Sequence, residues 1–171
     1  AGFVNYSADS LIGLQAAGFC NANFGELRGA QLAGFCNYNQ RNFKGIQGSG
    51  FANVSLDNFY GAQLSGFANV IHGNIDGVQA SGFFNYAKKV KGIQLGFLNF
   101  ADSVDGVAIG FLSFSRKGLH QIELSSDEVF YTNVSMRTGG YGFYNILSTG
   151  FSPKNGTTLW NVGYGAGTSI K

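Results

Sequence analysis

The sequence predicts an all-β protein: a parallel β-solenoid with two strands in each coil, followed by an antiparallel β-meander. Three observations lead to this fold class. A 16-residue unit recurs through the first two thirds of the 171-residue chain. The same residue types return at the same positions of each unit, and glycine (27 residues) far outnumbers proline (one residue). Self-similarity at a short fixed period indicates a solenoid.

Each unit reads G-F-x-N-φ followed by φ-x-G-φ-Q-φ, with φ apolar, and about eight coils begin between Gly2 and Gly110. Five steps of sixteen residues are followed by two of fourteen. Because a one-residue loss inside a strand would turn its side chains to the other face, we expect the missing residues to belong to corners. The segments G-F-x-N-φ and G-φ-Q-φ are therefore the expected strands, with glycine at the corners because it tolerates positive φ.

Aligning the units places like residues in columns, and stacked β-coils about 4.8 Å apart would turn each column into a ladder. Asn and Gln can pass amide hydrogen bonds along such a stack, and Phe rings can stack on one another. We expect the Asn and Gln columns to be structural ladders and the Phe column to be the candidate interaction stripe. The Phe column is Phe3, Phe19, Phe35, Phe51, Phe67, Phe83, Phe97 and Phe111. The Asn column is Asn5, Asn21, Asn37, Asn53, Asn69, Asn85 and Asn99, and the Gln column is Gln15, Gln31, Gln47, Gln63, Gln79 and Gln94.

The G-F-x-N-φ strand is apolar on both faces, which leaves open which face is buried. A sheet that is apolar on both faces expects cover on both. The favoured interpretation is that one face fills the solenoid core and the other packs on the C-terminal part of this chain. The alternative is that the second face docks onto a partner.

Cys20 and Cys36 occupy the same position of adjacent coils. A Cα separation of about 4.8 Å would fall inside the disulfide range, but directly stacked neighbours point the same way, which favours two buried thiols over a bridge. No His or further Cys stands at ligand spacing, so no metal site is expected.

The repeat decays after Leu112, and the sequence predicts a boundary between a solenoid, residues 1–124, and a meander, residues 125–171, packed on the solenoid or continuing it. Alternating apolar residues predict strands over 129–137, 141–151 and 158–168. Gly139-Gly140 and residues 152–156 are the expected turns. Because an uncapped coil exposes a strand edge, we expect further chain or a partner at each end.

Composition excludes several function classes. Only 12% of residues are charged and the net charge is +2, which argues against nucleic acid; the cluster Lys88, Lys89 and Lys91 reads as a solvated loop. No run of 18 apolar residues exists, so no membrane-spanning helix is expected. The carboxylates stand singly in corner positions, and His72 and His120 are isolated. We therefore expect no catalytic residues, no cofactor and no enzymatic activity.

Three functions remain open for the ladders. The first is a structural or docking protein that presents flat Phe, Asn and Gln ladders to a protein partner. The second is a carbohydrate-binding solenoid in which aromatic rings stack on sugars and amides donate hydrogen bonds. The third is an ice-binding solenoid, which regular ranks of Thr would support; Thr is absent before Thr132.

Residues 82–114, G-F-F-N-Y-A-K-K-V-K-G-I-Q-L-G-F-L-N-F-A-D-S-V-D-G-V-A-I-G-F-L-S-F, resemble the surface-repeat proteins of Bacteroidetes-type bacteria, whose G-φ-Q-φ-A-G-φ-x-N-φ units recur similarly. The tail also resembles the segment that follows those repeats, at 143–147 and 160–168. The resemblance thus covers nearly the whole chain and provides no catalytic residues. It implies export to the periplasm, outer membrane or surface of a Gram-negative bacterium. It also implies an accessory or pore-occluding subunit of an outer-membrane transport or secretion assembly, with an outer-membrane β-barrel as candidate partner.

Overall fold

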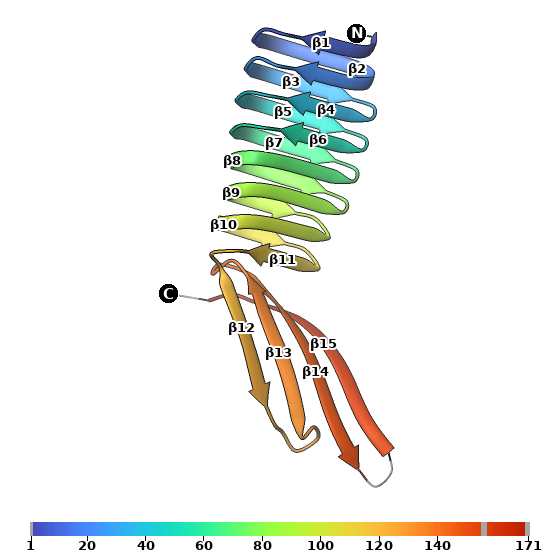
Figure 1. The fold of residues 1–171 in the computed structure, drawn as a ribbon, viewed down its shortest axis with the longest axis vertical. Helices are drawn as coiled ribbons and strands as arrows, with labels where there is room; N and C mark the ends of the chain where they lie inside the picture. Colours follow the sequence, from blue (N-terminus) through green and yellow to red (C-terminus); the bar gives the residue numbers. More distant parts are fainter. Residues whose placement is uncertain (1, 155–156, 170–171) are drawn as a thin grey trace.

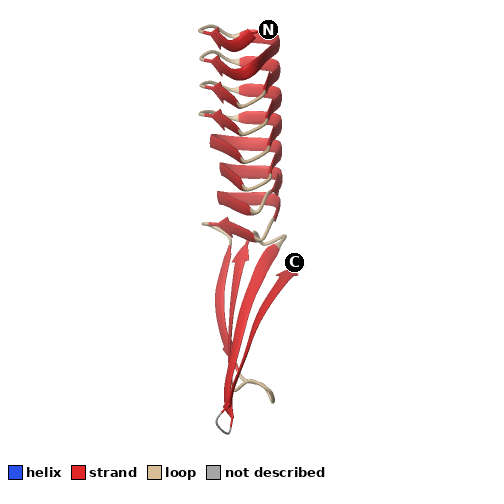
Figure 2. Ribbon diagram, turned by 90° about the vertical axis from the view of Figure 1, so that its right-hand side faces the viewer, coloured by secondary structure: helices blue, strands red, loops and turns tan. Residues whose placement is uncertain are grey.

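The structure is a computed structural model that describes residues 2–154 and 157–169, and these residues contain strands and no helix. A parallel β-solenoid of about seven turns is followed by a four-stranded antiparallel sheet that extends from one end of the solenoid (Figures 1 and 2). The predicted fold class is confirmed.

Every neighbouring pair of solenoid strands is parallel, and successive units pair in register: Asn21 lies beside Asn37, and Gly29 beside Gly45. All of these strands belong to one continuous 11-stranded sheet. They are β1 (Gly2–Ser7), β2 (Leu11–Asn23), β3 (Leu27–Ala33), β4 (Cys36–Asn39), β5 (Phe43–Ser49), β6 (Ala52–Ser55), β7 (Phe59–Ser65), β8 (Ala68–Ser81), β9 (Phe84–Leu95), β10 (Leu98–Ile109) and β11 (Leu112–Ser115).

Each unit has two recurring glycines: one at the corner immediately before Phe, and one inside a strand, two residues before Gln. The sequence analysis did not separate them. The glycine two residues before each Gln lies inside a strand, and it has a positive φ, such as 136° at Gly45. A Cβ on Gly45 would lie only 1.9 Å from the carbonyl oxygen of Gly29. The expectation that positive φ belongs to the corners is therefore wrong, because this conformation is needed where neighbouring coils approach each other within the strands.

The two-strands-per-coil pattern also changes along the solenoid. Strands β8, β9 and β10 run for 12 to 14 residues and include both the Asn segment and the Gln segment of their unit. The corner opposite the Gly-Phe pair is therefore a bend within one strand in these coils. The continuous strands include β9 and β10 of the two 14-residue units and also β8, whose unit from Gly66 has sixteen residues.

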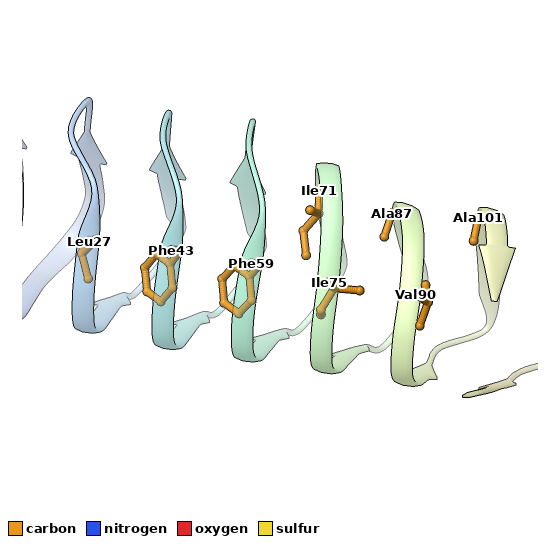
Figure 3. Packing of buried hydrophobic residues seen from close by; sticks show 8 residues of the cluster. All are labelled: Leu27, Phe43, Phe59, Ile71, Ile75, Ala87, Val90 and Ala101. Atoms are coloured by element: carbon orange, nitrogen blue, oxygen red, sulfur yellow. The ribbon is translucent and has the colours of Figure 1, made fainter. Parts of the chain in front are cut away.

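The interior of the solenoid is half apolar and half amide. The apolar half is a stack of buried side chains (Figure 3), of which Phe43 and Phe59 lie with ring centroids 4.7 Å apart. Its members are Leu27, Phe43, Phe59, Ile71, Ile75, Ala87, Val90 and Ala101. The Asn and Gln columns fill the other half, so the face of the Asn strand that carries Asn is the buried one. The other face points outward.

The C-terminal sheet consists of β12 (Leu119–Ser125), β13 (Thr132–Gly139), β14 (Tyr144–Lys154) and β15 (Thr157–Gly167), in that order. Strand β12 was not anticipated, and the change of architecture comes after Ser115 rather than at residue 124. The connection between β13 and β14 spans residues 140–143, so Gly140 lies in it but Gly139 ends the strand. Of the other expected turn, residues 152–154 belong to β14 because they pair with β15, and residues 155 and 156 lie outside the described residues.

The C-terminal sheet covers the end of the solenoid and not its outward face, so the favoured interpretation of the second apolar face is wrong. Asn145 Oδ1 accepts a hydrogen bond from the Ser113 backbone N–H at 2.9 Å, and its Nδ2 donates to the Gly110 carbonyl at 3.0 Å. Thr138 also donates to the Ser113 carbonyl, at 3.4 Å. These polar contacts occupy the edge of the last coil, which would otherwise be unpaired.

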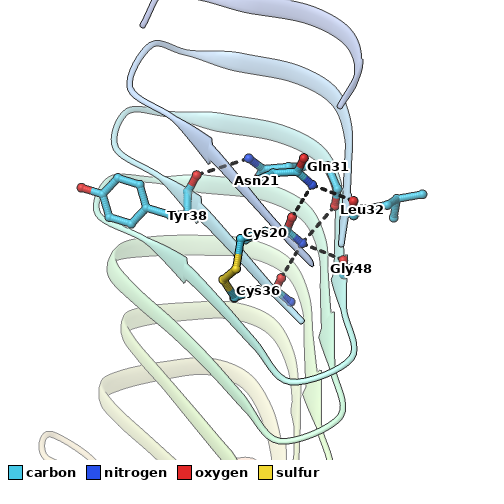
Figure 4. Close-up of a disulfide and its surroundings, with 9 residues drawn as sticks. Cys20, Asn21, Gln31, Leu32, Cys36, Tyr38 and Gly48 are labelled. Atoms are coloured by element: carbon cyan, nitrogen blue, oxygen red, sulfur yellow. Dashed lines mark hydrogen bonds between the residues drawn. A yellow bond between two sulfur atoms is a disulfide. The ribbon is translucent and has the colours of Figure 1, made fainter. Parts of the chain in front are cut away.

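Cys20 and Cys36 form a disulfide with a Cα separation of 4.7 Å (Figure 4). The expectation of two thiols is wrong. Both side chains do point the same way from neighbouring strands, but this separation lies within the disulfide range, and rotation of the side chains brings the sulfur atoms together.

Candidate functional site

The Phe column forms an exposed ladder along one edge of the solenoid, at the corner between the Gln strand and the next Asn strand. Adjacent rings are stacked, from Phe3 on Phe19 at 5.0 Å between centroids to Phe97 on Phe111 at 4.9 Å, with interplanar angles of 12° or less throughout. The rings within the ladder are 39% to 47% exposed, and Phe3 at its end is 72% exposed. The candidate interaction stripe is thus one continuous aromatic surface.

Tight backbone packing at the corner sets the position of these rings. A Cβ on Gly34 would lie 2.1 Å from the carbonyl oxygen of Gly18, so only glycine fits immediately before Phe35. The Phe35 N–H then donates to the Phe19 carbonyl at 2.9 Å, and Phe51 repeats this bond to Phe35 at 3.0 Å. Because corner stacks on corner with hydrogen bonds, the rings are held at the spacing of the coils.

The Asn ladder lies directly inside this corner, and Figure 4 shows one of its members, Asn21. Asn21 Nδ2 donates to Asn37 Oδ1 at 2.8 Å and to the Leu32 carbonyl at 2.6 Å. The first bond connects successive coils, and the second ties the Asn strand to the Gln strand. The same pair of bonds recurs at Asn53, where the distances are 3.0 Å to Asn69 and 2.6 Å to the Leu64 carbonyl.

The Gln ladder runs beside the Asn ladder with the opposite direction of donation. Gln47 donates to Gln31 at 2.7 Å and Gln63 donates to Gln47 at 2.8 Å, toward the N-terminus, whereas each Asn donates toward the C-terminus. The ladder ends at Gln94, whose Oε1 is buried without a partner because Ala108 stands where the next Gln would donate.

Both amide ladders are buried, with the Gln and Asn side chains of the central coils at 0% exposure. The expectation that they are presented to a partner is wrong, because their hydrogen-bonding capacity is used inside the solenoid. Only the Phe column of the three reaches the surface.

A shallow apolar groove flanks the Phe ladder on the side of the Gln strands. Its wall alternates between large and small residues in the order Leu32, Gly48, Leu64, Ala80 and Leu95. Large residues therefore recur at every second coil, about 9.6 Å apart at the usual strand spacing. The ladder and groove together form an apolar surface with a regular relief.

The geometry of the rings disfavours the carbohydrate interpretation. A sugar stacks on the face of an aromatic ring, but from Phe19 to Phe111 each ring of the ladder has both faces against neighbouring rings, for example Phe51 on Phe67 at 5.0 Å and 2°. Only ring edges point outward. The amides that would donate to a glycan are buried.

The titratable groups do not converge on a site within residues 2–154 and 157–169. No three His, Cys, Asp or Glu side chains come close enough together there to hold a metal ion. His120 packs against the Phe114 ring at 4.7 Å, and His72 meets the edge of Tyr86 at 6.2 Å. Hydrogen bonds from the Phe130 and Val129 backbone N–H groups lower the pKa of Asp127, which holds a surface turn.

Tyr164 is a functional candidate that the sequence analysis did not place in the ladder. Its ring stacks on Phe111 at 5.4 Å and 12°, and its hydroxyl donates to the Gly110 carbonyl at 2.9 Å. The C-terminal sheet thus adds one more ring to the aromatic stack. No repeat signal could reveal this, because Tyr164 lies outside the repeat.

Comparison with family models, curated proteins and solved structures finds no match to this chain. The described part of the chain includes no helix with the length and hydropathy of a membrane span.

Proposed function

We propose that this chain is a non-enzymatic docking protein whose Phe ladder and flanking groove bind a protein partner. The observation that supports this proposal most strongly is the exposure of eight stacked rings along one rigid edge. Monomeric proteins rarely expose contiguous apolar surface of this extent unless it binds something. The relief of the groove favours a partner that is itself regularly spaced, such as another β-structure.

An exported location fits the same proposal. Disulfides persist in oxidising compartments and are rare in the reducing cytosol, and Cys20 and Cys36 form one. Together with the resemblance to envelope surface-repeat proteins, this bond supports a place in the envelope of a Gram-negative bacterium. An accessory or pore-occluding role at an outer-membrane transport or secretion assembly stays a prediction that rests on the resemblance alone.

The test compares binding of envelope proteins by the folded wild type and by a double variant, Phe51→Ser with Phe67→Ser. The matched control is Leu56→Ser, because Leu56 is 38% exposed, similar to the two rings, but lies at the opposite corner. A partner should be retained by the wild type and by the control, and lost by the double variant. Equal retention by all three would rule out the Phe ladder as the docking surface.

A glycan array provides the second arm of the test. We expect no saccharide to bind, because the ring faces are covered and the amides are buried. Binding that the Phe51→Ser and Phe67→Ser variant abolishes would favour the carbohydrate function instead.

A further inference from the structure

The C-terminal sheet has one face on which apolar side chains gather and an opposite face that is mostly polar, with Ile146 and Leu159 as apolar members. The pairing of β12 with β13, β14 and β15 aligns Ile122, Met136, Leu147 and Tyr164 in one row across the sheet. A second row and a third row lie on the same side, because alternate residues of a strand share a face. Excluding Tyr164, which bonds the solenoid, we call the following set the apolar face: Ile122, Leu124, Val134, Met136, Leu147, Phe151, Trp160 and Val162.

The apolar face is uncovered. Ile122 is 79% exposed, and Leu124, Trp160 and Val162 are each 73% or 74% exposed. The solenoid meets this side of the sheet through Thr138 and Asn145 in the end row and through Tyr164 in the next row. A sheet with one apolar face must bury that face against another layer to be stable, and two such sheets pack about 10 Å apart.

The charge distribution allows the apolar face of one copy to pack on the apolar face of a second copy. On this side of β12 to β15 the described residues include no Asp, Glu, Lys or Arg. The charged pair of the sheet, Glu123 and Arg137, joins at 2.6 Å on the opposite face. Two copies packed face to face would therefore bring no like charges together. Repulsion between like charges, which opposes the association of identical faces, is absent here.

The size of the face also suits a dimer. Four strands about 4.8 Å apart and about eight residues long, at about 3.4 Å each, give a footprint of roughly 500 Å² per copy. The total of about 1,000 Å² reaches the lower limit for a specific interface. An interface of this size belongs to the small, reversible class of associations.

Lipid is a poorer cover for the same face. Strands β12 and β15 are the two edges of the sheet, and each has backbone N–H and C=O groups that no neighbouring strand of the described chain pairs. Unsatisfied backbone groups cost several kcal/mol each in hydrocarbon, whereas at a protein interface in water they stay hydrated.

We propose that the apolar face is a homodimer interface, in which the sheets of two copies pack face to face as a two-layer sandwich about a two-fold axis. The dimer places two solenoids, and thus two Phe ladders, in one assembly. It does not depend on the docking function of the ladder, and the Phe51→Ser, Phe67→Ser variant should dimerise as the wild type does.

The test is sedimentation velocity of the whole chain between about 1 and 100 μM. Trp160 is the only Trp of the chain, so its fluorescence reports on the apolar face alone. We expect a dimer at the upper concentrations and a blue shift of Trp160 emission that follows the dimer fraction. Val162→Glu should weaken association at least about 100-fold, because it brings two carboxylates into a dry interface.

The matched control is Asn161→Glu, which introduces the same residue one position earlier on the polar face. It should leave both the dimer and the Trp160 shift unchanged, and equal melting temperatures would show that both variants fold. A wild type that is monomeric at 100 μM overturns the proposal, as does equal loss in both variants. A Trp160 shift that requires added phosphatidylcholine and phosphatidylglycerol vesicles, without self-association, would assign the face to lipid and also overturn it.

Discussion

Removing one amide from the middle of the Asn ladder tests how much these buried side chains stabilise the solenoid. Asn53 is completely buried and takes part in three hydrogen bonds: it donates to Asn69 Oδ1 and to the Leu64 carbonyl, and it accepts from Asn37. In Asn53→Ala, the first two acceptors lose their donor inside the protein. Asn37 keeps its bond to the Gly48 carbonyl at 2.6 Å.

Two buried acceptors without partners cost about 1 to 3 kcal/mol each, so we expect Asn53→Ala to lower the free energy of unfolding by about 2 to 6 kcal/mol. The loss is a large part of the 5 to 15 kcal/mol typical of a folded domain. Urea unfolding followed by circular dichroism measures it. Asn161→Ala, on the exposed strand β15, is the control and should stay within about 0.5 kcal/mol of the wild type. A loss below about 1 kcal/mol in Asn53→Ala would refute the view that the ladder is a major source of stability.

Three further substitutions probe the backbone, the core and the cross-link. Gly45→Ala should cost about 3 kcal/mol or more in urea unfolding, since its Cβ would collide with backbone at a positive φ; Gly48→Ala, 3.1 Å from a Leu side chain, should be tolerated, and equal effects would contradict the strand geometry. Phe59→Ala should cost about 3 to 5 kcal/mol because its ring is fully buried, and Phe67→Ala at the exposed corner about 1 to 2. The reverse order would place the Phe ladder inside. Cys20→Ser should lower stability by about 3 kcal/mol, as expected for a loop of 16 residues, and reductant should reproduce its melting temperature in the wild type. No effect of reductant would mean that the bond does not form.

The stacking register could be predicted because the repeat itself contains the evidence. Identical residues recur at a fixed spacing, and the 14-residue units show which positions can be lost. The amide hydrogen bonds at Asn53 and Gln47 follow directly once like residues lie above one another. Their burial was not predicted, since Asn and Gln patterns look alike whether the amides bond to one another or to a partner.

The repeat pattern could not predict features that depend on tertiary contacts. Strand β12 lies where the repeat decays, and its pairing is set by β13, which comes later in the chain. The contact of Asn145 with the last coil joins residues 32 and 35 positions apart, and no sequence pattern connects them. The positive φ at Gly45 results from the approach of the neighbouring coil, which a single unit does not show.

The sequence indicates that each C-terminal strand has two faces, but the apolar face of the whole sheet can be identified only when the strand pairing is known. Residues 158–168 alternate in polarity, so each strand separately indicates two faces. Only the register among four strands shows that most of the apolar residues gather on the same side, whereas Ile146 and Leu159 lie on the other.

Directed cross-linking between neighbouring coils tests the parallel stack most directly. Ala52 and Ala68 are direct neighbours in β6 and β8, at the position that Cys20 and Cys36 occupy in earlier coils. With the native cysteines replaced by serine, Ala52→Cys with Ala68→Cys should oxidise to an intramolecular disulfide, detected by mass spectrometry of proteolytic peptides. Ala52→Cys with Val70→Cys, displaced by two residues, should remain largely reduced. Absence of the first bond, or equal formation of both, would contradict the in-register parallel arrangement.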